Sequence, residues 1–133
     1  MGATANLNNE GQSIINANDS TVIVDNFATI RGGRTLDVTG HTPDVINAGH
    51  VIIKHTATDL YKPMPLATND TVYGSLPGGY EYAGILVASI LKAKPFAGIM
   101  VQGTMNYAVA PFDMTTILAA VRTALPLIDF RKD

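Results

Sequence analysis

The stretch YAGILVASILKAKPFAGIMVQGTMNYAVAPF, from Tyr82 to Phe112, is among the most apolar parts of the chain and decides the fold. Its longest apolar run, Ala83 to Leu91, covers nine residues and is broken by Ser89. A helix that crosses a membrane needs about 20 apolar residues, so this run is too short. It is rich in Ile and Val and bounded by turn-forming residues, as buried strands are. We therefore expect the centre of a β core here.

Size and composition are those of one small domain with a sparsely charged surface. The chain has 133 residues, of which 47% are hydrophobic and 15% charged, whereas about 25% of an ordinary soluble protein is charged. A large neutral surface fits a protein that is partly covered by another one. A compact, sparingly charged monomer fits the composition as well.

Charge and cysteine content exclude several classes of function. The net charge is −2 and the nine Lys and Arg residues are scattered, so no basic patch for a nucleic acid is expected. Without cysteine the chain has no disulfide, no thiolate metal site and no cysteine nucleophile. The first 20 residues lack the charged start and apolar run of a signal peptide. We expect neither a nucleic acid nor a membrane as partner.

Three segments are expected along the chain. Residues 1–19 are mostly Asn, Ala, Gly and Ser, and predict a flexible N-terminal arm. Residues 20–47 begin with STVIVDNFATI, a β-prone run, and are expected as a second segment. Residues 48–133 are expected to form the compact β domain. The sequence does not decide whether residues 20–47 belong to the arm or to the domain.

Turn-forming residues divide the β domain into strands. Arg31 to Gly33 and the Pro-Gly-Gly at 77–79 predict tight turns. Pro63 and Pro65 confine their strand to a sheet edge, since proline cannot donate to a ladder. Strands at 82–91 and 98–101 are separated by a short polar loop and are natural hairpin partners.

One helix is expected near the C-terminus. Asp113 is a good N-cap, and Pro126 stops the helix. Four aliphatic residues at helical spacing then share one face: Ile117, Leu118, Val121 and Leu125. The fold class is thus mainly β with one short α-helix.

No catalytic or metal-binding arrangement is found. His41, His50 and His55 are expected to be solvated or in loops, and the last two to lie on opposite sides of a strand. The chain has two glutamates, and no Gly-x-Ser-x-Gly elbow or phosphate-binding glycine loop. We expect no enzyme activity, no cofactor and no metal.

Four pieces of the chain, in order, resemble the lambda-type head decoration proteins of tailed bacteriophages. The resemblance covers 48–130 and rests on order and spacing, because each piece consists only of aliphatic residues around a glycine. The pieces are AGHVII (Ala48 to Ile53), YAGILVASI (Tyr82 to Ile90), GIMVQGTMNYAV (Gly98 to Val109) and the closing TILAAVRTALPLIDF.

The resemblance implies a fold and a function. It implies a small sandwich-like or barrel-like domain (β-tulip-like) with an extended N-terminal arm. Such proteins sit as trimers on the outside of the expanded capsid, where the arm gains strands from the major capsid protein. The function would be to stabilise the virion against the pressure of its DNA, after synthesis in the cytoplasm of the host bacterium.

Two sets of residues are the candidate contacts. The β-prone run is suited to strand addition, and the expected capsid contacts are Thr21, Val22, Ile23, Val24 and Phe27. These residues fit an ordinary first strand of the domain as well. The candidate trimer contacts are Ile117, Val121 and Leu125, for which plain core packing is the alternative.

Two other functions remain open. The protein could be another virion component, such as the base of a head fibre. It could also be a small carbohydrate-binding module, for which Tyr73, Tyr80 and Tyr82 near the Pro-Gly-Gly turn would form the sugar platform.

Overall fold

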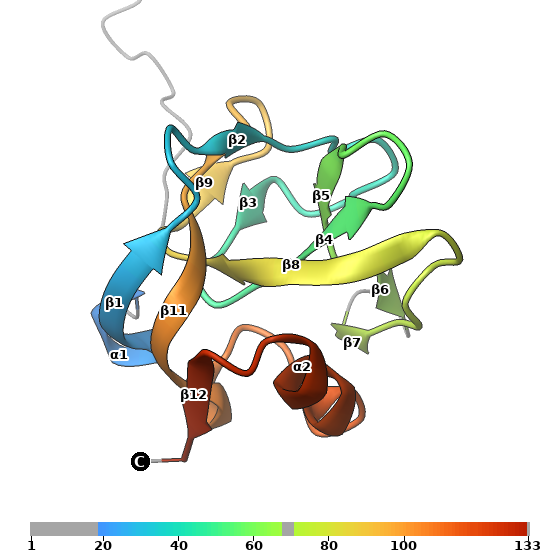
Figure 1. Ribbon diagram of the computed structural model, residues 1–133. Coiled ribbons are helices and arrows are strands. Elements are labelled where there is room, and N and C mark those ends of the chain that lie inside the picture. Colours follow the sequence, from blue (N-terminus) through green and yellow to red (C-terminus); the bar gives the residue numbers. More distant parts are fainter. Residues whose placement is uncertain (1–18, 68–70, 133) are drawn as a thin grey trace, which may run out of the picture.

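The computed structural model describes residues 19–67 and 71–132, and within them the protein is mainly β (Figure 1). The strands are β1 (Ile23–Thr29), β2 (Arg34–Thr35), β3 (Val45–Ile46), β4 (Val51–His55), β5 (Tyr61–Pro63), β6 (Leu66–Ala67), β7 (Val72–Tyr73), β8 (Tyr80–Leu86), β9 (Ile90–Leu91), β10 (Phe96–Ala97), β11 (Ile99–Asn106) and β12 (Ile128–Arg131). The helical elements are α1 (Asp19–Val22), the 3₁₀ turn η1 (Tyr107–Val109) and α2 (Leu118–Ala124). The expected class, mainly β with one short helix, is confirmed.

The main sheet has the order β1-β11-β8-β4-β5, all antiparallel, and β12 joins it parallel to β11. Strand β11 changes its neighbour on one side along its length: Ile99 and Met100 pair with β8, and 103–106 pair with β12. In the described residues β1 and β5 do not pair with each other, so the sheet stays open. The barrel-like closure that the resemblance implied is therefore not formed.

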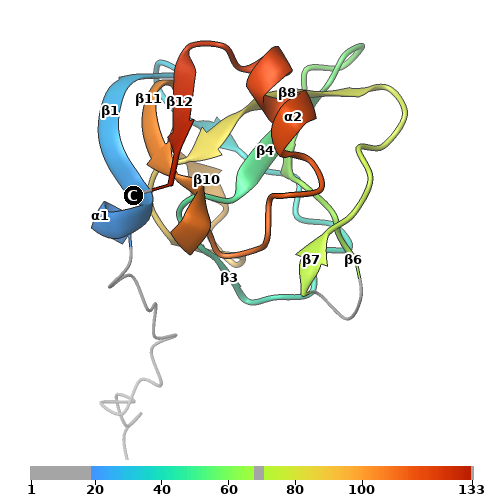
Figure 2. The ribbon, with the colours of Figure 1, turned by 90° about the horizontal axis from the view of Figure 1, so that it is seen from below.

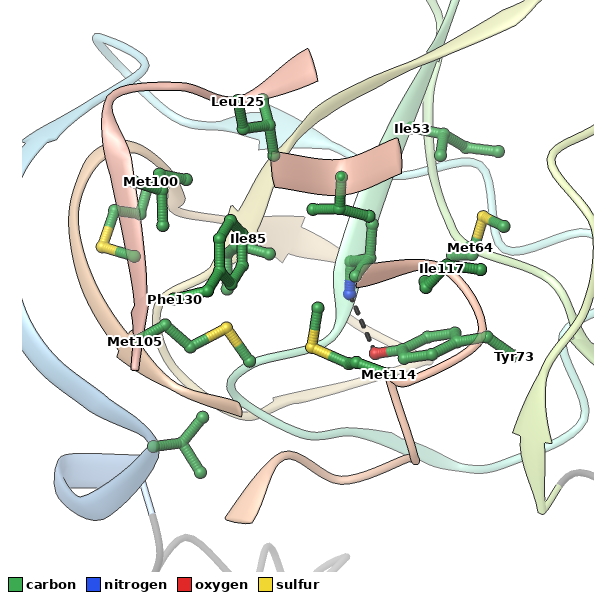
Figure 3. Packing of buried hydrophobic residues seen from close by; sticks show 14 residues of the cluster. Ile53, Met64, Tyr73, Ile85, Met100, Met105, Met114, Ile117, Leu125 and Phe130 are labelled. Atoms are coloured by element: carbon green, nitrogen blue, oxygen red, sulfur yellow. Dashed lines mark hydrogen bonds between the residues drawn. The ribbon is translucent and has the colours of Figure 1, made fainter. Parts of the chain in front are cut away.

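Side chains from both faces of the main sheet are buried, in two separate cores. Successive residues of a strand point to opposite faces, and β4 follows this rule: Val51 and Ile53 enter one core, Ile52 the other. The α2-side core includes Tyr73, Val121 and Phe130, and Figure 3 shows its packing. The β9-side core lies where β2, β3, β9 and β10 cover the sheet (Figures 1 and 2).

The stretch that opened the sequence analysis supplies the centre of the fold. It holds β8 to β11, and Leu86 pairs with Ile99, so the expected hairpin partners are confirmed. Between them the chain leaves the sheet: β9 pairs with β3, and β10 with β2. Among the described helices none is long and apolar enough to cross a membrane.

Residues 20–47 are built into the same body as the rest. Strand β1 pairs along β11, and Leu36 and Ile46 are buried in the β9-side core. The boundary expected between 47 and 48 therefore does not separate two bodies. The expected arm, residues 1–19, lies outside the described residues except for Asp19.

The helix begins later than expected. The Asp113 carboxylate accepts a hydrogen bond from the backbone N–H of Thr115 at 2.9 Å, which closes a local turn and not a helix cap. The helix α2 starts at Leu118, with Ile117 as its N-cap residue. Pro126 follows the C-cap residue Leu125, as expected.

The two expected glycine turns and the proline edge are confirmed. Gly33 donates to the carbonyl of Ile30, and Tyr80 to that of Pro77, with positive φ at Gly32 (77°) and Gly79 (80°). Pro63 lies in β5, the last strand of the main sheet on that side.

Candidate functional site: the β1 edge

Strand β1 is an edge strand that is bulged twice. Its residues pair with β11 in the order Ile23↔Met105, Asp25↔Thr104, Asn26↔Gly103 and Ala28↔Gln102. This register skips Val24 and Phe27. A β-bulge inserts a residue without a partner, bends the strand and redirects the side chain. The two bulges therefore take Val24 and Phe27 out of the regular pairing.

The skipped residues carry exposed apolar side chains. Val24 is 44% exposed and Phe27 is 69% exposed. All four residues from 24 to 27 are exposed, whereas β12, on the other side of β11, alternates between buried and exposed. Every second side chain of β12 is therefore buried in the core, whereas no side chain from residue 24 to residue 27 of β1 is buried.

Exposed residues also lie on β12, on the other side of β11, whereas residues 103–106 of β11 between the two strands are buried. The carbonyl of Leu127 accepts a hydrogen bond from the N–H of Gly103 at 3.3 Å, and Leu127 is 64% exposed. One position further along, Thr104 pairs with Asp25 on one side and with Asp129 on the other. Figures 1 and 2 show β1, β11 and β12 side by side at one end of the molecule. We call the exposed residues Val24, Asp25, Phe27, Leu127 and Asp129 the β1 face.

Sequence reasoning found only part of the β1 face. It selected Val24 and Phe27 but missed Leu127 and Asp129, which are about 100 positions away in the chain. The alternation of LPLIDF, with Ile128 and Phe130 buried and their neighbours exposed, was the available signal.

The other three expected capsid contacts are placed differently. Thr21 is exposed in α1. Val22 is 2% exposed and packs in the α2-side core, where Gly49 leaves the room that its side chain fills. Ile23 is half-buried against the same core. Val22 therefore belongs to the interior and is not available for a contact with another protein.

The described chain begins at an anchored residue. The Asp19 carboxylate accepts hydrogen bonds from the Ser89 backbone N–H at 2.9 Å and from its hydroxyl at 2.7 Å. The Ser89 hydroxyl oxygen also accepts from the N–H of Ala48 at 3.0 Å. These bonds fix the position of Asp19 at the start of α1, which leads directly into β1.

The expected trimer contacts lie in the interior of one chain. Val121 is 0% exposed, and Ile117 and Leu125 are each 8% exposed. Their side chains point into the α2-side core, as Figure 3 shows for Ile117 and Leu125. A side chain that is buried in its own chain cannot contact a second copy, so this set is corrected to core packing.

The tyrosines do not form an exposed platform. Tyr73 is 4% exposed, and its hydroxyl oxygen accepts a hydrogen bond from the N–H of Val51 at 3.1 Å (Figure 3). Burial raises the pKa of Tyr73 above its usual value. Tyr80 is half-buried, with the Lys62 ammonium 4.8 Å from its ring centre and His55 against its edge. The cluster expected for sugar binding therefore loses Tyr73.

The histidines were expected to be solvated or in loops, and His50 lies in a loop but is not solvated. His50 is 1% exposed in the interior. His55 is half-buried, and its Nδ1 accepts from the N–H groups of Ala57 and Thr58 in the turn after β4. Within the described ranges no group of three or more His, Cys, Asp or Glu side chains could hold a metal ion.

Surface hollows also occur in the described part of the chain. One, of about 160 Å³, lies between the 37–42 loop and residues 62–66; its titratable side chains are Asp37, His41 and Lys62. Hydrogen bonds from the Thr39 side chain and from the Thr39 N–H to the Asp37 carboxylate lower the pKa of Asp37. The Asp37 carboxylate is thus hydrogen-bonded within its own loop.

Comparison of the chain with protein-family models, with curated proteins and with solved structures gave no match. The functional argument therefore rests on the sequence and on the geometry given above.

Proposed function

We propose that this protein is a capsid decoration protein: it binds the outer surface of an expanded phage capsid and stabilises the shell against the pressure of the packaged DNA. The sequence resemblance supports the proposal through the position of its pieces. The first three pieces overlap β4, β8 and β11, and the fourth overlaps α2 and β12. The three strands are adjacent in the main sheet, and β12 extends it.

The observation that carries the proposal is the β1 face. An edge strand with exposed apolar side chains is a site at which another protein can bind. Val24 and Phe27 are placed there by two bulges, and Leu127 adds a third apolar side chain. Asp19 precedes β1 by only a few positions in the chain, so residues 1–18 and the face are proposed to contact the same partner, the major capsid protein.

The mode of contact follows from the pairing of β1. One side of β1 is already hydrogen-bonded to β11, and its bulges interrupt a regular ladder on the other side. We therefore assign to β1 a contact through side chains. The strand that is added to the capsid protein is expected within residues 1–18, which lie outside the described residues.

Several modest contacts made at the same time give firm binding. A homotrimer presents three β1 faces and three N-terminal segments to the shell, and linked contacts bind far more tightly than single ones. The trimer contact has to be made by exposed residues, because Ile117, Val121 and Leu125 are buried. Sedimentation equilibrium of the free protein measures whether the trimer exists before binding.

Co-sedimentation with expanded capsids that lack this protein tests the proposal. Four chains are compared: the full chain, a chain starting at Asp19, a V24S/F27S variant and a Phe96→Ser control. Phe96 is 61% exposed but lies on β10, away from the β1 face.

We expect the full chain and the Phe96→Ser variant to pellet and saturate, and the other two to bind at least tenfold more weakly. If V24S/F27S binds like the full chain, the β1 face is not the contact. If the full chain itself stays in solution, the decoration function is wrong.

A further inference from the structure

His50 is a buried histidine that connects segments far apart in the sequence. It lies in the turn before β4 and is 1% exposed. Three rings meet its imidazole edge to face: His41 at 5.6 Å between ring centres, Tyr73 at 5.2 Å and Phe112 at 5.5 Å. Tyr73 and Phe112 also contact each other, at 5.5 Å. We call these four residues the His50 cluster.

The polar atoms of His50 are unequally satisfied. Its Nε2 lies 3.0 Å from the carbonyl oxygen of Met64, so Nε2 carries the proton and donates. Its Nδ1 is buried and has no hydrogen-bond partner in the part of the chain that the structure describes. A second proton on this ring would add a buried charge and an N–H without an acceptor, which is costly.

The groups around His50 do not stabilise a charge on it. From the 37–42 loop only His41 faces it, and a charge on His41 repels one on His50. From β7 the neutral Tyr73 faces it, and from 63–65 only the Met64 carbonyl. Next to Phe112, Asp113 is exposed and its carboxylate accepts from Thr115. Burial therefore dominates and lowers the pKa of His50 to about 3, although the Met64 carbonyl acts in the opposite direction.

The His50 cluster attaches one outer layer of the α2-side core to the main sheet. Val72 of β7 forms a parallel bridge with Asp113, so β7 and residues 110–113 lie together. Their links to β4 include the rings of Tyr73 and Phe112 on His50 and the hydrogen bond from Val51 to the Tyr73 hydroxyl. We call β7 and residues 110–113 the outer layer.

We propose that His50 is an acid-operated latch: when its Nδ1 takes up a proton from solvent, the outer layer detaches from β4 while the main sheet stays folded. In the proposed open state Tyr73 and Phe112 move away from the ring, and water reaches its Nδ1. The Met64 carbonyl can remain bonded to Nε2. This device is independent of the proposed capsid function and belongs to the fold itself.

The direction of the pH effect follows from proton binding. The latched state binds the second proton only near pH 3, whereas an exposed histidine binds it near pH 6.5. The open state therefore binds more protons between these values, and the latched state loses stability as the pH falls. The opening equilibrium is expected to rise about tenfold for each pH unit below about 6.5.

Amide hydrogen exchange of the full chain, corrected for the intrinsic effect of pH, tests the latch. The reporters are the N–H of Val51, bonded to Tyr73, and that of Gly74, bonded to the carbonyl of Pro65. The references are the N–H groups of Ile30 and Val87, bonded to the carbonyls of Ile99 and Gly98. Between pH 6 and pH 4 we expect the reporters to lose about a hundredfold in protection and the references to keep theirs.

Variants separate His50 from the other histidines. His50→Phe keeps a ring but removes the titrating atom, so the reporters should show the same protection at pH 4 and pH 6. His55→Gln is the control and should retain the pH dependence of the natural chain. If reporters and references lose protection together, the latch is wrong, because acid then unfolds the whole domain.

The ring itself supplies a readout that needs no variant, should His50→Phe fail to fold. In a ¹H–¹⁵N spectrum of the full chain, His50 should remain the neutral Nε2–H tautomer as long as the reporters are protected. A His50 that titrates near pH 6.5 without loss of protection would overturn the proposal.

Discussion

The β5 edge of the main sheet is closed by its own chain, whereas the β1 edge is open. At β5 the strand has three residues and ends in Pro63. Leu36 forms a parallel bridge with Tyr61, and the N–H of Asp37 donates to the Tyr61 carbonyl at 2.8 Å. At β1 the strand has seven residues and no proline, and no described residue pairs with its outer side.

The two edges use different protections against unwanted pairing. Short strands, prolines and a covering segment block β5, whereas bulges alone interrupt β1. Bulges prevent a long regular ladder but leave side chains accessible, and here those side chains are Val24 and Phe27. The difference indicates that β5 is purely structural and that β1 combines a structural inner side with an outer side suited to contact.

Gly103→Ala should have the largest effect on stability, because it disrupts the pairing of β11 with the inner side of β1. A Cβ at residue 103 would collide with the backbone carbonyl of Asp25 and lie 2.6 Å from Met100 Sδ. Since backbone cannot move aside cheaply, we expect a loss of about 3 kcal/mol in the free energy of unfolding. Urea denaturation followed by circular dichroism measures it.

Gly98→Ala is the matched control for that substitution. Its Cβ would have no neighbour closer than Val87 at 3.9 Å, so the change should stay within about 0.5 kcal/mol. If Gly103→Ala lowers the free energy of unfolding as little as Gly98→Ala does, the pairing of β1 with β11 contributes little to stability. The inner and outer sides of β1 would then not differ as described.

Leu36→Ala tests the closed edge. Leu36 is 3% exposed in the β9-side core and carries the bridge to β5. We expect the free energy of unfolding to fall by about 2 kcal/mol, and light scattering to show association through the uncovered β5. Leu60→Ala, 57% exposed in the loop between β4 and β5, is the control and should do neither. Equal effects would mean that residues 36–37 do not close this edge.

The sequence was sufficient to predict the elements whose cause is local. The strand at 98–101 followed from its aliphatic run, and the edge position of β5 from Pro63. The run at 82–91 predicted β8, which ends at Leu86, but not that Ile90 and Leu91 form a separate strand with β3. The turns at Gly32 and Gly79 followed from the freedom of glycine. Asp113 shows the limit of local reasoning, because a side chain that caps a helix also closes a turn.

Features that depend on distant residues could not be read in this way. The run at 20–30 was recognised as β-prone, but its pairing with β11 joins residues about 80 positions apart, and its bulges exist only in that pairing. His50 was expected to be solvated or in a loop, because no carboxylate or cysteine cluster in the sequence completes a metal site around it. It is buried by rings from positions 41, 73 and 112. The helical spacing of Ile117, Val121 and Leu125 predicted an apolar face but not what covers it.

Val22 and Val24 form a matched pair on one segment. Val22 is 2% exposed, and its truncation to alanine should cost about 2 kcal/mol in the free energy of unfolding. Val24 is 44% exposed at a bulge, and the same change there should cost less than about 0.5 kcal/mol. Chemical denaturation of both variants gives the two values. Similar costs would show that Val24 is packed, and that the β1 face is smaller than described.

Phe27→Ser should have the smallest effect of all on stability. Phe27 is skipped by the register of β1 and is 69% exposed, so little apolar burial is lost with its ring. We expect the free energy of unfolding to change by less than about 0.5 kcal/mol, and Phe96→Ser on β10 to behave alike. Thermal unfolding of both variants measures this. A loss of more than about 1 kcal/mol for Phe27→Ser alone would mean that the ring supports the edge. Weakened capsid binding of V24S/F27S could then reflect a damaged fold, whereas unchanged stability would make that loss a direct property of the β1 face.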